Sequence, residues 1–371
     1  MLKKKVIALG AVAIAASLIA APSANAGAKP AAKANVGDEC LREGTKAAGR
    51  GVNGSDLTCT KVATGTFAGS LRWWYPEMKP FGSLEWVASS AIGGGYGTTA
   101  IAIGDAMKKE GLLKDYTVTY KTNAPLGLGY FYDQKDRKDL LLITGFAMPG
   151  GLATNGSKLT ITTAHAVAGI MREAEAFVVP TSSKYKTIND LLADIKANPK
   201  AVAIGGGNYG GVDHVTVATL AATVGVKATD LNYIPYSGGG TLTPDVIGGR
   251  VAVGISGTSE FSSYVAAGKM RVLAVTSPKP LKVIKGKTLV QQGVDLTFGN
   301  WRGILAPATL TEAERVNWLK VVDVTRAGDA WKATLVAKDW QNQTDYGKDF
   351  EAFLASQKKD ITTTLVSLGL A

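Results

Sequence analysis

The chain has 371 residues, of which 46% are hydrophobic and 19% are charged, and its formal net charge is +11. This balance is typical of a globular protein rather than a disordered or fibrous one, and the length allows two ordinary domains. Beyond the first five residues no tract rich in Lys or Arg and no nucleic-acid-binding motif occurs, so the sequence disfavours nucleic acid as a partner. A basic protein also suits an anionic ligand or an anionic envelope surface.

The first 26 residues have the pattern of a secretory signal peptide. Lysines at positions 3–5 form a basic start, residues 6–21 are apolar, and the alanines at 24 and 26 give a small-x-small cleavage site. The apolar run is short for a membrane span of about 20 residues, so an uncleaved anchor is the less favoured alternative. We therefore expect a soluble protein exported to the periplasm or the extracellular cell envelope.

Residues 27–36 are small, polar and rich in alanine, and they predict a flexible linker. Residues 37–78 predict a small β module that contains the only two cysteines, Cys40 and Cys59. In an oxidising compartment these cysteines are expected to pair, and closing a loop of about 20 residues stabilises it by roughly 3 kcal/mol in the chain-entropy model. Two cysteines without a nearby histidine make a zinc site improbable. We expect a structural appendage rather than a binding module.

From residue 84 onwards, strand and helix patterns alternate, which predicts an α/β architecture with mostly parallel sheets. A helix that begins near Thr187 has near capping-box spacing to Asp190, and a second helix begins with Thr311 and Glu314. The predicted strands are residues 84–89, 140–143, 176–180, 201–204, 232–235, 251–255, 271–275 and 303–305. The other predicted helices are residues 98–109, a segment ending near 224, and one within 348–368.

Three glycine clusters, at residues 93–97, 205–211 and 238–240, each follow a predicted strand. Glycine lets a ligand approach the backbone closely, and the first turn of a following helix offers unpaired N–H groups that hold an anion. Ligands of open α/β sheets bind at such carboxyl-end crevices. One cluster alone is explained by tight turns, but three in equivalent positions favour a binding site for a molecule with two or more carboxylates.

Enzymatic readings have less support. Gly205, Gly207 and Gly210 match the spacing of a dinucleotide-binding loop, but Asp230 precedes the next strand instead of ending it, so the ribose-binding acid is missing. The only histidines are His165 and His214, and no nucleophile elbow, HExxH or CxxC motif occurs. The sequence therefore predicts a binding protein without catalytic residues, metal or cofactor.

Several stretches beyond residue 84 form a recognisable order: residues 90–96 (SAIGGGY), 183–191 (SKYKTINDL), 204–214, 235–239 (PYSGG), 247–251 (IGGRV), 254–261, 267–275 (AGKMRVLAV) and 300–303 (NWRG). Through these stretches, from residue 84 to the end, the chain resembles the substrate-binding components of tripartite tricarboxylate transporters, the TctC/Bug family, and most of all its tricarboxylate-type branch.

The resemblance implies a periplasmic-binding-protein fold, in which two α/β lobes are joined by crossing strands and close over the ligand in a central cleft. It places the crossings near residues 177–180 and 301–306, lobe one at 80–178 plus 303–371, and lobe two at 179–302. It also implies a monomer that delivers a small carboxylate to a membrane permease. The expected ligand-binding residues are Gly94, Gly95, Tyr96, Thr98, Gly207, Tyr209, Gly210, Gly211, His214, Ser237, Gly238, Gly239, Ser256 and Trp301.

The chain departs from the family pattern at four positions. Gly97 and Ala252 stand where the family often has Asp, Thr241 where related sequences often have Glu, and Ser237 where Lys is common. Losing acids favours more negative ligands and losing a lysine does the opposite, so citrate is one example within an open class of di- and tricarboxylates. A receptor that feeds a membrane sensor is the alternative function, and a dinucleotide-dependent enzyme is less favoured.

Overall fold

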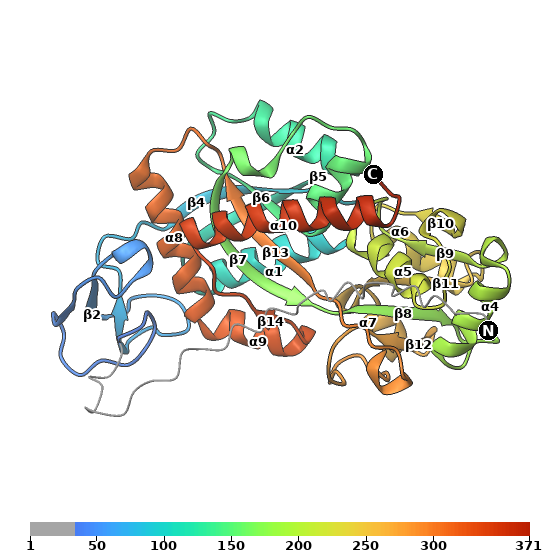
Figure 1. Ribbon diagram of the computed structural model, residues 1–371. Helices are drawn as coiled ribbons and strands as arrows, with labels where there is room; N and C mark the ends of the chain where they lie inside the picture. Colours follow the sequence, from blue (N-terminus) through green and yellow to red (C-terminus); the bar gives the residue numbers. More distant parts are fainter. Residues whose placement is uncertain (1–33) are drawn as a thin grey trace, which may run out of the picture. The chain divides into compact units, whose positions relative to one another are not determined.

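The computed structural model describes residues 34–371, and the predicted signal peptide and most of the predicted linker lie outside the described residues. Three sheets are present in this part of the chain (Figure 1). The first is a small antiparallel sheet near the N-terminal end, and the other two are larger sheets surrounded by helices. Within residues 34–371, no helix is both long enough and apolar enough to span a bilayer.

The larger sheet has six strands in the order β14-β7-β13-β6-β4-β5. We call the part of the chain built on it lobe one. Its strands are β4 (Phe81–Ala88), β5 (Leu113–Tyr120), β6 (Leu140–Gly145), β7 (His165–Glu173), β13 (Asn300–Ala306) and β14 (Gln341–Asn342). Its helices are α1 (Gly95–Lys109), α2 (Ala124–Asp133), α3 (Ala147–Thr154), α8 (Glu312–Ala327), α9 (Asp329–Lys338) and α10 (Gly347–Ser367).

The second sheet has five strands in the order β10-β9-β11-β8-β12, and we call the part built on it lobe two. Its strands are β8 (Glu175–Pro180), β9 (Ala203–Gly206), β10 (Asn232–Pro235), β11 (Val253–Gly257) and β12 (Met270–Val275). Its helices are α4 (Ile188–Ala197), α5 (Val212–Ala222), α6 (Gly239–Ile247) and α7 (Thr258–Ala266). The predicted α/β fold is therefore confirmed.

The sheets are mixed rather than mostly parallel. β4 pairs in parallel with β5 and β6, and β9 pairs in parallel with β10 and β11. β13 pairs antiparallel with β6 and β7, and β8 pairs antiparallel with β11 and β12. The antiparallel pairs involve the strands next to the crossings, because these strands enter each sheet from the other lobe.

The chain crosses between the lobes at Ala174, the single residue between β7 and β8 (Figure 1). Residues 175–178, which the sequence assigned to lobe one, therefore lie in the second sheet. The return crossing is residues 276–299, between β12 and β13. Glu173 and Glu175 flank the first crossing, so two carboxyl groups lie at the junction of the lobes.

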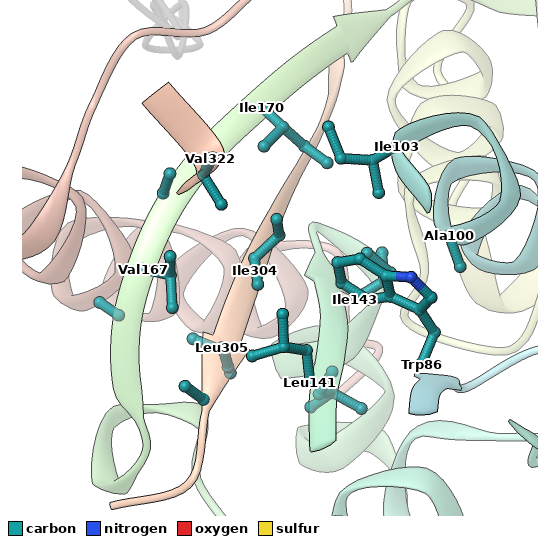
Figure 2. Packing of buried hydrophobic residues seen from close by; sticks show 14 of the residues in the cluster. Trp86, Ala100, Ile103, Leu141, Ile143, Val167, Ile170, Ile304, Leu305 and Val322 are labelled. Carbon is teal, nitrogen blue, oxygen red and sulfur yellow. The ribbon is translucent and has the colours of Figure 1, made fainter. Parts of the chain in front are cut away.

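The core of lobe one is continuous across its sheet (Figure 2). Trp86 of β4, Ile143 of β6 and Ile304 of β13 are fully buried there, with Ile103 from α1 and Val322 from α8 packed against the sheet. All six residues of β6 are buried. A strand that is covered by helices on both faces is expected to be apolar without alternation.

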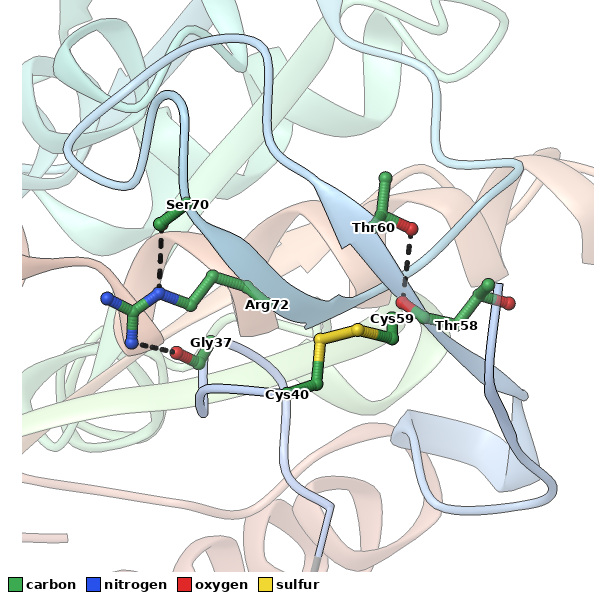
Figure 3. The surroundings of a disulfide bond; sticks show 7 residues. All are labelled: Gly37, Cys40, Thr58, Cys59, Thr60, Ser70 and Arg72. Atoms are coloured by element: carbon green, nitrogen blue, oxygen red, sulfur yellow. Dashed lines mark hydrogen bonds between the residues drawn. A yellow bond between two sulfur atoms is a disulfide. The ribbon is translucent and has the colours of Figure 1, made fainter. Parts of the chain in front are cut away.

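The small sheet consists of β1 (Lys46–Ala47), β2 (Leu57–Lys61) and β3 (Leu71–Trp74). The predicted disulfide is confirmed, because Cys40 and Cys59 are joined with an S–S distance of 2.02 Å (Figure 3). This segment is less separate than the sequence suggested. Tyr75 is buried in the core of lobe one and donates a hydrogen bond of 2.6 Å to Asp323 of α8.

Candidate functional site

A small cavity lies between the lobes, where the carboxyl ends of β4, β9, β10 and β11 face the beginning of β13. It measures about 60 Å³, which is room for a few water molecules. Its lining residues are Ser89, Ser90, Gly95, Tyr96, Ala147, Gly207, Asn208, Gly211, Val212, Asp213, Ser237, Gly238, Ser256, Glu260, Asn300 and Arg302.

The lobes touch on both sides of this cavity. The Ala91 N–H of lobe one donates a hydrogen bond of 2.9 Å to the Ser237 carbonyl of lobe two, and the Thr154 hydroxyl donates one of 3.0 Å to the Tyr209 carbonyl. Gly238 has a φ of +121°, and a Cβ atom added there would lie 2.8 Å from the Gly94 Cα atom. The closed arrangement therefore depends on glycine at this contact, where two backbones meet without side chains between them.

Two helices direct unpaired backbone donors toward the cavity. α1 and α5 begin directly after Gly94 and Gly211, and neither of these N-cap residues supplies a side-chain cap. Within residues 34–371, the first three N–H groups of each helix, at 95–97 and 212–214, have no hydrogen-bond acceptor. Such groups at the positive end of the helix dipole attract an anion. This agrees with the sequence prediction for two of the three glycine clusters.

The third predicted anion site is already filled by the protein itself. At the start of α6, the Gly239 N–H donates a hydrogen bond of 2.7 Å to the Glu260 carboxylate. The same carboxylate accepts a hydrogen bond of 2.9 Å from the Ser256 hydroxyl. In the second glycine cluster, the Gly207 N–H likewise donates to the Asp213 carboxylate at 2.6 Å. The expectation that all three loops offer free N–H groups is thus corrected, because acidic side chains from lobe two occupy these donors.

Arg302 of β13 faces these acids at the base of the cavity. It is 4% exposed and forms an ion pair with Glu173, which is also buried. Burial alone would lower the pKa of the Arg302 guanidinium, but the charges of Glu173 and Glu260 outweigh this effect and raise it. Arg302 therefore remains a cation inside the cleft.

The neighbouring carboxyl groups are harder to ionise than usual. Burial, the Asp213 carboxylate and the Glu173 carboxylate raise the pKa of Glu175 well above its ordinary value. Burial is also the largest cause for Asp213 and Glu260, whose pKa values are raised to about 6 and about 7. Glu260 is consequently about half ionised at neutral pH.

Seven of the fourteen predicted ligand-binding residues line the cavity: Gly95, Tyr96, Gly207, Gly211, Ser237, Gly238 and Ser256. Two more, Gly94 and Gly239, lie directly beside it through the contacts with Gly238 and Glu260. Thr98 donates its N–H to the Gly94 carbonyl within the first turn of α1 and is not in the lining. Half of the predicted set is therefore brought together as expected.

The remaining predicted residues do not line the cavity. His214 packs against Tyr209 and Tyr233, and its Nδ1 accepts a hydrogen bond of 3.2 Å from the Gly210 N–H. Burial lowers the pKa of His214 to about 4, so the imidazole is neutral. Tyr209 and His214 line a different hollow of about 330 Å³, together with Thr154 and Tyr233.

Trp301 lies away from the cleft, in the core of lobe one. Its side chain packs against Phe350 and Phe353 of α10, and its Nε1 donates a hydrogen bond of 2.8 Å to Gln357. Because successive residues of a strand point to opposite faces, Arg302 faces the cavity instead. The structure therefore places the neighbouring residue of the same motif, and not Trp301, in the cavity lining.

The family model described as "Tripartite tricarboxylate transporter family receptor" matches residues 157–361. The chain belongs to this family. The receptor is thus a member of a solute-binding family rather than an enzyme family, as the sequence predicted.

The curated relatives of this receptor are aligned over only part of their length. The chain spans 35% and 58% of the length of two of them. The second, a UPF0065 protein of Cupriavidus necator, is 26% identical over 200 residues, which are 52% of this chain.

Solved structures support the fold of the receptor. The periplasmic binding protein BugD is similar with a TM-score of 0.68 and 17% identity, over 80% of this chain and 99% of that protein. MatC from Rhodopseudomonas palustris, whose structure contains bound malate, has a TM-score of 0.67 and 14% identity, over 76% and 98% of the two chains. The two-lobe binding-protein fold is thus confirmed.

Proposed function

We propose that this protein is an extracytoplasmic receptor that captures a small di- or tricarboxylate, such as malate or citrate, between its lobes. The observation that carries the proposal is the set of unpaired donors around the cavity. The free N–H groups of α1 and α5 lie there, and so do polar groups that have no hydrogen-bond partner within residues 34–371, namely the Ser89 and Ser90 hydroxyls and the Nε of Arg302. Buried donors without acceptors are costly, and carboxylate oxygens would satisfy several of them at once.

The size of the cavity supports a compact ligand. Its volume of about 60 Å³ in the closed arrangement is small, so a four-carbon dicarboxylate or citrate requires less opening than a long or aromatic acid. A neighbouring structure was determined with malate and another with adipate. We infer that malate and citrate are the first ligands to examine, with adipate as a longer dicarboxylate.

We further propose that the loaded receptor delivers its ligand to the permease of a tripartite tricarboxylate transporter. The family description supports this partner, and the predicted signal peptide supports export to the periplasm or cell envelope. Opening and closing would occur at the two crossings, Ala174 and residues 276–299, because these are the connections between the sheets.

The proposal is tested by thermal unfolding and calorimetry of residues 27–371 with malate, citrate, succinate, adipate, carboxylated aromatics, amino acids and NAD. A ligand at 100 times its dissociation constant stabilises the folded state by about 2.7 kcal/mol, which a melting curve detects. We expect stabilisation by one carboxylate class and no turnover. Stabilisation by NAD alone, or identical X-ray scattering with and without a tightly bound carboxylate, would contradict the proposed capture mechanism.

A further inference from the structure

Arg302 has a fixed position at the base of the cavity. Its Nη1 group is bonded to the Glu173 carboxylate and donates a hydrogen bond of 3.3 Å to the Thr99 hydroxyl. Glu173 is itself held by a hydrogen bond of 3.0 Å from the Trp340 indole and one of 2.9 Å from the Ser259 hydroxyl. The Nη1 group of Arg302 is therefore fully hydrogen-bonded, and the Glu173 carboxylate that binds it is held in a fixed orientation.

The other side of the same guanidinium is free. In the part of the chain that the structure describes, the buried Nε of Arg302 has no hydrogen-bond partner, and Nη2 forms no hydrogen bond either. These two N–H groups point in nearly the same direction and are spaced like the two oxygens of a carboxylate. The exposed pair Arg137–Asp139 shows this geometry on the surface of the same chain, with N···O distances of 3.0 and 2.9 Å.

The free side of Arg302 lies next to the start of α1. A Cβ atom added to Gly95 would be 2.0 Å from Nη2, so the guanidinium packs directly against the helix backbone. A cation is unfavourable at this positive end of a helix dipole. An anion placed there would contact both the guanidinium and the free N–H groups of α1.

We propose that Arg302 is the specificity-determining residue of the cleft: its Nε and Nη2 groups bind one carboxylate of the ligand in a bidentate manner, while Glu173 positions it through Nη1. This inference rests on the proposed function and adds a chemical requirement to it. The end of the ligand that reaches β13 must be a planar, ionised carboxylate. A primary amide at that end would direct an N–H group against one of the two donors, so the amide of a dicarboxylate should bind poorly.

The test compares wild-type protein with Arg302→Lys, which keeps the charge but loses the paired donors. Malate and citrate are the probes, and calorimetry measures their dissociation constants. We expect roughly ten- to hundredfold weaker binding in Arg302→Lys, as befits loss of a charge-assisted hydrogen bond. Arg250→Lys is the matched control, because Arg250 is exposed and pairs with Asp245 on the surface of lobe two. Its affinity should stay within about twofold of the wild type.

A second measurement does not depend on the folding of the variant. In a crystal structure of the wild-type complex with malate or citrate, two oxygens of one carboxylate should lie within hydrogen-bond distance of Nε and Nη2. If a probe binds the wild type but leaves these atoms without a carboxylate, or binds Arg302→Lys equally well, the role of Arg302 is refuted while the proposed function stands. If no carboxylate binds the wild type, both are refuted.

Discussion

The carboxyl group of Glu260 should make ligand affinity depend on pH. Glu260 lies in the cavity wall with a pKa of about 7, raised by burial and by the charges of Glu173 and Asp213. A second negative charge roughly 5 Å away would cost about 3 kcal/mol at an effective dielectric constant of about 20. Protonating Glu260 at about pH 8 costs only about 1.4 kcal/mol. The ligand should therefore bind mainly to the form in which Glu260 is protonated, and binding should take up a proton.

The sign and size of the effect follow from this pKa. Above pH 7, affinity for malate, which stays a dianion in this range, should fall toward tenfold for each pH unit. Glu260→Gln removes the charge, yet its amide oxygen can accept from Gly239 and its amide nitrogen can donate to Ser256. We expect this variant to bind malate about tenfold more tightly than wild type at about pH 8, and equally at about pH 5.5.

Calorimetry in two buffers of different ionisation enthalpy measures both the affinity and the number of protons taken up. Glu351→Gln, a change at an exposed position of α10, is the control and should leave the wild-type pH profile intact. A wild-type affinity that is constant between about pH 6.5 and 8.5, or a Glu260→Gln variant with the wild-type profile, would show that Glu260 does not titrate beside the ligand.

Three further predictions concern closure, the disulfide and the core. Gly238→Ala should weaken carboxylate binding, measured by calorimetry, by about tenfold, because the new Cβ would strike the facing backbone of lobe one. The control is Gly249→Ala, at a glycine that has a φ of +70° but open space around it, and this change should leave the affinity unchanged. Replacing Cys40 and Cys59 by Ser should lower the unfolding free energy of their segment by roughly 3 kcal/mol, measured by denaturation, and should not alter affinity; a changed dissociation constant would contradict this. Trp301→Phe should lower the free energy of unfolding by about 1 to 2 kcal/mol without a specific loss of ligand affinity. A loss of affinity without a loss of stability would show that Trp301 contacts the ligand.

Local sequence signals predicted the elements that depend on local chemistry. Thr187 with Asp190 and Thr311 with Glu314 both form capping boxes, at the beginnings of α4 and α8. The three glycine clusters each precede a helix, as expected. The antiparallel pairing of β7 with β13 was not predicted, because it joins residues more than 120 positions apart and depends on how the chain crosses between lobes.

The sequence predicted the backbone donors that surround the cavity, but it missed the charged side chains that lie there. Glu173 and Arg302 come from neighbouring strands of lobe one, whereas Asp213 and Glu260 come from lobe two, so the four charges meet only where the lobes touch. A signal was nevertheless present in the sequence. Charged residues are rarely buried without a partner, and Glu173, Glu175 and Arg302 interrupt runs that are otherwise apolar.

The contact between the N-terminal segment and Glu110 has a consequence for how the receptor can be shortened. Glu110, which caps the far end of α1 from the cavity, is 1% exposed, and its carboxylate accepts hydrogen bonds of 3.0 and 2.9 Å from Thr66. Starting the chain at residue 79 would remove Thr66. The Glu110 carboxylate would then accept only one of these hydrogen bonds, from the Ala330 N–H at 3.3 Å. The excision would also strip Tyr75 from the core. The disulfide-linked segment is therefore an inseparable part of lobe one, and the boundary suggested by family resemblance is not a place to cut.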